Sequence, residues 1–281
     1  MPRVVNTPQP SRRPAPEAST DAVSLRLPLC QIAMNASLKA KLGTMKWASD
    51  ASEKSKRVLV TGGTGVLGSA LTRELCAQGF EVVAWFRSNE ERAAQLGMET
   101  GCKLWQGDAA DEREVEDIFA TFQFEAIVHL AGWNQNALML QTSPLLWEKV
   151  LHSHLQSSFL MCRAALTHLP RGGQLVLVSS RVGLIGNGGQ SAYAAAKAGV
   201  FGLMKTAAFE GRERGVRVNV LCPGFAPGAG ELLAKRELLR REREDLIRDN
   251  DAAQSFAAFT TWLLASNSDV SGQILRPDCR I

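Results

Sequence analysis

The amino-acid sequence predicts an α/β fold in which helices cover both faces of one doubly wound parallel sheet. Short apolar strands alternate with helical stretches from residue 57 onward, a pattern typical of parallel sheets with right-handed crossovers. The first strand leads into Thr61-Gly62-Gly63-Thr64-Gly65-Val66-Leu67-Gly68 and then into a helix, which is the setting of a dinucleotide-binding turn. Together these observations predict a Rossmann-type sheet in a single domain over residues 57–281.

Residues 1–56 have a different composition, with crowded prolines and more basic than acidic side chains. This composition predicts a disordered extension without a catalytic role, in a cytoplasmic protein. Two alternatives stay open. Arginine and serine richness also resembles an organelle transit peptide, and Met45 is a second candidate for the true start.

The whole chain has the composition of a globular protein, with 45% hydrophobic and 21% charged residues. A formal net charge of +4, spread along the chain, gives no nucleic-acid footprint, and no apolar run reaches the roughly 20 residues of a membrane span. The six cysteines form no C-x-x-C pair and the four histidines form no ligand motif. We therefore expect no metal, no nucleic-acid partner and no membrane partner.

The glycine turn predicts where a dinucleotide binds. It follows a strand over residues 58–60 and opens a helix that Gly79 ends. Glycines let the backbone approach a pyrophosphate, and the helix N-terminus favours its negative charge. The residues of the turn that we expect to bind the cofactor are Gly62, Thr64, Gly65, Leu67 and Gly68.

The next two strands supply further cofactor contacts. The strand over residues 81–86 ends in Arg87, where an acidic residue would favour NAD; a cation there suits the 2′-phosphate of NADP, which we prefer. The strand over residues 103–106 leads to Asp108 and Ala109. Asp108 is a candidate acceptor for the adenine amino group or a cap for a helix over residues 111–122.

The second half of the domain continues the alternation. A strand over residues 126–130 ends at Ala131-Gly132, where cofactors lie in such sheets. Pro223-Gly224 ends a later strand, and we expect both pairs to contact the cofactor. The remaining expected elements are a helix over 145–169, strands over 174–178 and 216–221, an amphipathic lid over 225–251, a helix over 252–264 and a last strand near 273–275.

The candidate catalytic group is built on the only tyrosine in the chain. Tyr193 and Lys197 are four residues apart on an expected helix and therefore share one face. A nearby ammonium favours the phenolate, so the pair could exchange a proton closer to neutral pH. Ser180 follows a strand thirteen positions before Tyr193 and could hold a carbonyl oxygen beside the phenol.

These motifs, in this order, resemble the short-chain dehydrogenase/reductase family over residues 57–281. Within it, the stretches over 186–200 and 218–225 most resemble 3-oxoacyl-[acyl-carrier-protein] reductases. The resemblance implies that Tyr193 protonates a carbonyl oxygen, Ser180 orients it, and Lys197 lowers the phenol pKa and holds the nicotinamide ribose. It also implies a homodimer or homotetramer built on the helices that carry His154 and Tyr193.

Four positions depart from the family pattern. The glycine spacing is that of the family's extended branch, with Val66 where the compact branch has glycine, and the usual Asn-Asn-Ala-Gly is His129-Leu130-Ala131-Gly132. His154 stands where an asparagine anchors the proton-relay water, and imidazole can exchange protons in its place. Gly228 lies near the place of a threonine that meets the nicotinamide amide.

The leading hypothesis is an NADPH-dependent ketoreductase that reduces a 3-oxoacyl thioester of acyl carrier protein or coenzyme A, as in fatty acid biosynthesis. One alternative is a dehydrogenase or carbonyl reductase that acts on a free small-molecule alcohol or ketone. Another is a non-catalytic cofactor-binding member of the family. A sugar-nucleotide epimerase is disfavoured because the chain after Lys197 is short for a substrate domain.

Overall fold

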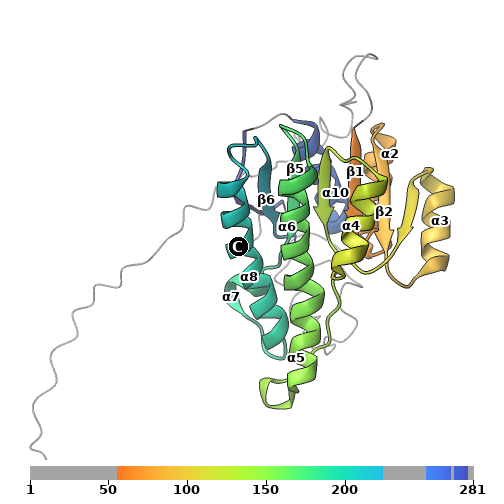
Figure 1. The fold of residues 1–281 in the computed structure, drawn as a ribbon. Coiled ribbons are helices and arrows are strands. Elements are labelled where there is room, and N and C mark those ends of the chain that lie inside the picture. Colours follow the sequence, from red (N-terminus) through yellow and green to blue (C-terminus); the bar gives the residue numbers. More distant parts are fainter. Residues whose placement is uncertain (1–55, 224–250, 267–268, 278–281) are drawn as a thin grey trace, which may run out of the picture.

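Seven parallel strands form one sheet in the computed structural model, which describes residues 56–223, 251–266 and 269–277. Their order across the sheet is β3-β2-β1-β4-β5-β6-β7, so the winding reverses between the first and fourth strands (Figure 1). This confirms the predicted doubly wound sheet. The strands are β1 (Arg57–Thr61), β2 (Glu81–Phe86), β3 (Lys103–Gln106), β4 (Ala126–His129), β5 (Gln174–Val178), β6 (Arg217–Leu221) and β7 (Ile274–Leu275).

Helices cover both faces of this sheet (Figure 1). On one face lie α2 (Val66–Ala77) and α10 (Asp251–Ala265); on the other lie α4 (Glu112–Thr121), α6 (Ser157–His168) and α8 (Ser191–Glu210). The described residues also form α3 (Glu90–Thr100) beside β3, α5 (Pro144–Leu151), α7 (Val182–Ile185) and a 3-10 turn, η1 (Met139–Gln141).

The two cores follow from the alternation of side chains along each strand. In β1, Leu59 packs against α4 and α6, whereas Val58 and Val60 pack against α2 and α10. All three side chains are fully buried. Strands covered on both faces must be apolar on both, which is why they appear in the sequence as short continuous apolar runs.

Polar side chains set where two of these helices begin. The Asp111 carboxylate accepts hydrogen bonds from the N–H groups of Arg113 and Glu114 at the start of α4. Asp108 is therefore not the cap of this helix, which was one of its two expected roles. Asn89 caps α3 by accepting from the N–H of Arg92. Helix α3 is an element that the sequence analysis did not name.

The helix expected over residues 145–169 is interrupted by one wide turn. Between α5 and α6 the backbone forms a π-helical turn, η2 (His152–Gln156), without leaving the helical path. Such wide turns are rare and occur frequently at functional sites. His154, one of the expected catalytic residues, lies in the middle of it.

Several expected features lie outside the described residues. These are the extension before Lys56, the lid over residues 225–250, and the two glycines Gly224 and Gly228. No described helix is both long and apolar enough to cross a membrane. Across residues 56–223, 251–266 and 269–277, no group of three His, Cys, Asp or Glu side chains gathers as metal ligands would.

Candidate active site

The expected catalytic residues meet at the carboxyl edge of the sheet. Ser180 lies two residues after β5, and Tyr193 lies in the first turn of α8. Helix α7 joins these segments and packs directly on α8, since a Cβ on Gly183 would lie 2.7 Å from the Lys197 carbonyl carbon. The Ser179 hydroxyl adds a 2.8 Å hydrogen bond to the Lys197 carbonyl oxygen. The Ser180 hydroxyl comes within hydrogen-bonding reach of the Tyr193 phenol in this arrangement.

Burial controls the acidity of the Tyr193 phenol. Loss of solvent raises its pKa above the ordinary value of 10.0, and the interaction with the Ser180 hydroxyl opposes this only in part. The prediction that Lys197 lowers the phenol pKa is therefore not met: the Lys197 ammonium lies 5.7 Å from the centre of the Tyr193 ring and does not offset the burial. The phenol is a proton donor at neutral pH.

Lys197 lies inside the protein beside that phenol. Its side chain is 6% exposed, and its Nζ donates a 2.9 Å hydrogen bond to the Val178 carbonyl oxygen at the end of β5. Burial lowers the pKa of the ammonium from 10.5 to about 8. An ammonium has three N–H donors, so two remain for a ligand after the bond to Val178.

His154 also packs against the Tyr193 ring. The imidazole and the Tyr193 ring meet edge to face, with centroids 5.1 Å apart and planes at 76°. His154 is 6% exposed, and neither ring nitrogen has a well-aligned hydrogen bond, although the Trp133 backbone slightly favours the protonated form. Burial, then Lys197 and His129, hold the His154 pKa well below 6.5, so the ring is neutral.

The glycine turn forms a cradle that fits a pyrophosphate. Gly62 has a φ of +69°, and a Cβ on Gly68 would lie 2.2 Å from the Gly62 carbonyl oxygen, so both positions require glycine. Helix α2 begins here with no side-chain cap and no acidic residue in its first turn. Its first N–H groups are consequently available to an anion. Thr64, Gly65 and Leu67 belong to the same turn.

Two other expected cofactor residues face each other at the ends of β2 and β3. The Arg87 guanidinium lies 3.5 Å from the Asp108 carboxylate, and the Asp108 Oδ1 also accepts from the N–H of Ala110. Both side chains are partly exposed. The ion pair holds Arg87 at the end of β2, where a 2′-phosphate would meet its charge. Ala109, the next residue, is buried.

Ala131 and Gly132 follow β4, and the backbone of Ala131 is held by a residue that was not among the expected site residues. The hydroxyl of Thr61 accepts hydrogen bonds from the N–H groups of Leu130 and Ala131, at 3.2 and 3.1 Å. Thr61 pairs with His129 across neighbouring parallel strands, and their side chains are 2.8 Å apart. The available signal was that a polar residue ends each of two apolar strands.

Side-chain amides join two loops in front of Tyr193, and these too were missed. Asn136 Oδ1 accepts from the amides of Asn134 and Gln190, at 2.8 and 3.0 Å. The Gln190 amide oxygen in turn accepts from Asn187 at 2.7 Å. The backbone adds a 2.9 Å bond from Ala137 N–H to the Gly189 carbonyl oxygen. The glycine-rich loop before Tyr193 is thereby fixed against the loop that follows Gly132.

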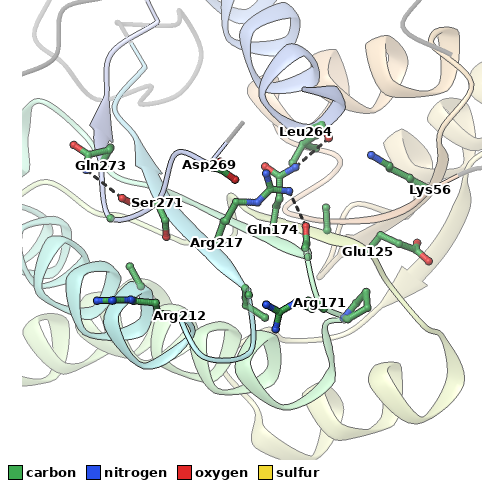
Figure 2. Close-up of a pocket in the computed structure, with 18 of the residues that line it drawn as sticks. Lys56, Glu125, Arg171, Gln174, Arg212, Arg217, Leu264, Asp269, Ser271 and Gln273 are labelled. Atoms are coloured by element: carbon green, nitrogen blue, oxygen red, sulfur yellow. Dashed lines mark hydrogen bonds between the residues drawn. The ribbon is translucent and has the colours of Figure 1, made fainter. Parts of the chain in front are cut away.

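A separate hollow of about 1010 Å³ lies at the opposite, amino edge of the strands (Figure 2). Most of its charged lining residues are basic, but some of its polar groups already bind backbone carbonyls: Arg217 donates to Gly172 at 2.7 Å and Gln174 donates to Leu264 at 3.0 Å. None of the expected site residues lines it. The charged lining residues are Lys56, Glu125, Arg171, Lys205, Arg212, Arg217 and Asp269.

The chain is similar in sequence to proteins named as reductases. Over 178 residues the chain is 34% identical to an acetoacetyl-CoA reductase of Rhizobium meliloti, which covers 61% of this chain and 74% of that one. It is 35% identical over 182 residues to a 3-oxoacyl-[acyl-carrier-protein] reductase of Escherichia coli, with the same two coverages. A carbonyl reductase family member 4 of Danio rerio is 35% identical over 180 residues, or 61% of this chain and 76% of that one.

A solved structure supports the fold independently. A short-chain dehydrogenase from Burkholderia cenocepacia, determined in complex with NADP, superposes with a TM-score of 0.72 over 79% of this chain and 95% of that chain. The identity is 24%, so this likeness concerns the fold. The family model described as short chain dehydrogenase matches residues 56–230, which include the glycine turn, Ser180, Tyr193 and Lys197. The chain therefore belongs to the short-chain dehydrogenase family of oxidoreductases.

Proposed function

We propose that this protein is an NADPH-dependent ketoreductase that reduces a 3-oxoacyl thioester to the 3-hydroxyacyl form. The observation that carries the proposal is the neutral phenol of Tyr193 beside the Ser180 hydroxyl, at the carboxyl edge of a sheet with a dinucleotide cradle. A protonated phenol is the form that donates to a carbonyl oxygen, so the geometry favours reduction over oxidation at neutral pH. The names of the relatives in Rhizobium meliloti and Escherichia coli support the thioester.

In this mechanism the side chains stabilise a developing alkoxide. The Ser180 hydroxyl donates a hydrogen bond to the substrate carbonyl oxygen, and the Tyr193 phenol transfers its proton to that oxygen. The cofactor, when bound, supplies the hydride that forms the new C–H bond at the carbonyl carbon. The Lys197 ammonium, anchored on Val178, offers its two remaining N–H groups to ribose hydroxyls. Prearranged donors of this kind lower the barrier without reorganising during the reaction.

His154 is part of the proposal as the proton-exchange residue behind Tyr193. Its imidazole meets the Tyr193 ring edge to face. Because the imidazole is neutral, one of its nitrogens can donate a hydrogen bond while the other accepts one. After Tyr193 gives its proton to the alkoxide, a group with both capacities is suited to help restore it. Pro223 ends the segment after β6 and completes the described part of the proposed cofactor site.

Arg87 is proposed to select NADPH over NADH. Replacing it with alanine removes a charge-assisted contact to the 2′-phosphate, which contributes about 1.5–3 kcal/mol. We expect the Kd for NADPH to rise about 10- to 100-fold and the Kd for NADH to change little, as measured by the fluorescence of the bound nicotinamide. Arg73→Ala is the matched control, because it removes an exposed ion pair between Arg73 of α2 and Glu99 of α3. Equal losses for both cofactors would contradict this role.

The substrate is tested by comparing acetoacetyl-CoA, acetoacetyl-acyl-carrier-protein and a free ketone in an assay of NADPH oxidation. We expect kcat/KM for either thioester to exceed that for the free ketone. A preference for the free ketone would favour the alternative, which the carbonyl reductase of Danio rerio supports. Tight NADPH binding without turnover of any carbonyl would favour a non-catalytic role.

The proposal extends to assembly and location. We infer a homodimer or homotetramer built on α6 and α8, because Phe159 and Phe209 on these helices are 43% and 78% exposed. An acyl carrier protein is the proposed partner if the protein-linked thioester is the better substrate. We place the activity in the cytoplasm, since Cys76, Cys102 and Cys162 carry thiols that are not joined in disulfides.

A further inference from the structure

His129 is a buried imidazole to which the proposed mechanism gives no role. It ends β4, it is 2% exposed, and it pairs with Thr61 of β1 in the parallel register. Its Nδ1 lies 2.8 Å from the Thr61 hydroxyl, and its Nε2 lies 3.0 Å from the Ser157 hydroxyl at the start of α6. A single ring therefore joins two adjacent strands of the sheet to the helix that lies over them.

The hydrogen-bond partners determine which ring nitrogen carries the proton. Thr61 Oγ1 already accepts from the N–H groups of Leu130 and Ala131, so its two lone pairs are used and its own proton points to Nδ1. At the other end, Ser157 donates its proton to the Ser153 carbonyl oxygen at 2.7 Å and so accepts from Nε2. Both ends independently give the same neutral tautomer, with the proton on Nε2.

The two ends of the hydrogen-bonded bridge Thr61–His129–Ser157 hold the two halves of the candidate active site. At the first end, Thr61 fixes Ala131 and immediately precedes Gly62 of the pyrophosphate cradle. At the second end, Ser153 and Ser157 bracket His154 in the π-helical turn η2. The Ser153 hydroxyl also bonds both the N–H and the carbonyl oxygen of Trp133, at 3.0 and 2.9 Å.

The ring of His154 fills the space between these halves. A Cβ on Gly132 would lie 2.0 Å from its ring atoms, and its other edge meets Tyr193. A shift of η2 relative to Gly132 would consequently move the imidazole against the phenol. Because His129 is the bridge between Thr61 and Ser157, it sets that relative position.

We propose that His129 is a positioning residue that holds the cofactor wall at residues 130–132 in register with the turn that carries His154. It acts through Thr61 on the first and through Ser157 on the second, without touching substrate or cofactor. The titratable groups that bear on it are Lys197 and His154, and the Lys197 charge helps to keep the ring neutral. The turnover part of this proposal rests on the proposed reductase function, but the bridge itself does not.

Two substitutions separate the ends of the bridge. In His129→Asn the amide oxygen replaces Nδ1 as the acceptor from Thr61, and the contact with Ser157 is lost. In His129→Gln the amide nitrogen replaces Nε2 as the donor to Ser157, and the contact with Thr61 is lost. His152→Asn is the matched control, because His152 is an exposed histidine of the same turn.

Each end has a readout that does not depend on turnover. The cofactor wall is followed by the Kd for NADPH. The position of the π-helical turn η2 is followed by titrating Tyr193 through phenolate absorbance near 295 nm. This signal reports Tyr193 alone because the chain has no other tyrosine. The kcat with acetoacetyl-CoA is measured in parallel.

We expect His129→Gln to raise the Kd for NADPH about 5- to 20-fold with an unchanged phenol titration. We expect His129→Asn to keep that Kd within about twofold while the Tyr193 pKa moves down toward 10 and kcat falls about 5- to 20-fold. Parallel changes in both variants, or a loss of thermal stability alone, would overturn the positioning role. If neither variant folds, Thr61→Val and Ser157→Ala cut the same two ends and must show the same split.

The outcomes also separate this proposal from the proposed function. If the unmodified protein reduces no acyl thioester, the reductase proposal fails, but the Kd and the phenol titration still decide the role of His129. If the protein is an active reductase and the two variants show no split, only the positioning role fails.

Discussion

Replacing Tyr193 with phenylalanine is expected to lower kcat for acetoacetyl-CoA about 10²- to 10⁴-fold at pH 7, with the Kd for NADPH nearly unchanged. The substitution removes only the hydroxyl that donates the proton, and it keeps the ring that packs against His154. Ser180 and the bound cofactor can still polarise the carbonyl, but no acid completes the transfer. The effect is measured by steady-state NADPH oxidation at saturating substrate.

The pH dependence of the unmodified protein completes this prediction. Burial raises the Tyr193 pKa and lowers the Lys197 pKa to about 8. As the pH rises, Lys197 therefore loses its proton first, while the Tyr193 phenol stays protonated. The rate of reduction should therefore fall as pH rises through about 8, where the ammonium loses its proton. Thr206→Ala, an exposed change on the same helix, is the control for Tyr193→Phe. Retention of more than about a tenth of the activity by Tyr193→Phe would contradict the acid role.

The second large effect is a loss of stability in mild acid. Burial lowers the pKa of His129 from 6.5 to about 3 and holds that of His154 well below 6.5, so both rings stay neutral in the folded protein. The unfolded chain binds protons on both as the pH falls below about 6.5, and the folded protein does not. These two rings therefore leave stability unchanged above that pH, and they decrease it as the pH falls from 6.5 toward 3.

The magnitude follows from the two protons. At pH 5, about 1.5 units below the unfolded value, the His129 imidazole costs about 2 kcal/mol, and the His154 imidazole adds a cost of the same sign. That is a large part of the 5–15 kcal/mol typical of a folded domain. Urea unfolding at pH 7.5, 6.5, 5.5 and 5 measures the slope.

His129→Asn should reduce this acid-dependent loss by about 2 kcal/mol at pH 5, and His154→Asn should reduce it as well. The exposed His168→Asn should leave it unchanged and is the matched control. A free energy of unfolding that stays level between pH 6.5 and 5 would show that the two buried rings take up protons in the folded state.

Much of the fold was predictable because its strands are apolar on both faces. β1, β2, β4, β5 and β6 all coincide with expected strands to within one or two residues at each end. Helix α3 escaped because only Ala93 and Leu96 of its residues are buried, which is too few to give an apolar period.

The site was predictable where local order along the chain sets the chemistry, and less so where distant segments meet. Tyr193 and Lys197 share a helix, so their spacing alone placed them together. The bridge through His129 depends on the pairing of strands β1 and β4 and on Ser157, which lies 28 residues after His129 in the sequence. The phenol pKa depends on burial, which spacing cannot supply, and this is why the expected direction of its shift was wrong.

The position of β6 in the sheet has a consequence for synthesis of the chain. β6 is bordered by β7, and the core on one of its faces includes Phe256 of α10, so part of its cover comes from residues beyond 250. A polypeptide leaving the ribosome exposes its N-terminal part first, and parallel pairings form slowly. Until α10 and β7 arrive, β6 presents an unpaired edge that another nascent chain can extend. Translation that stalls before residue 251 should therefore lead to aggregation.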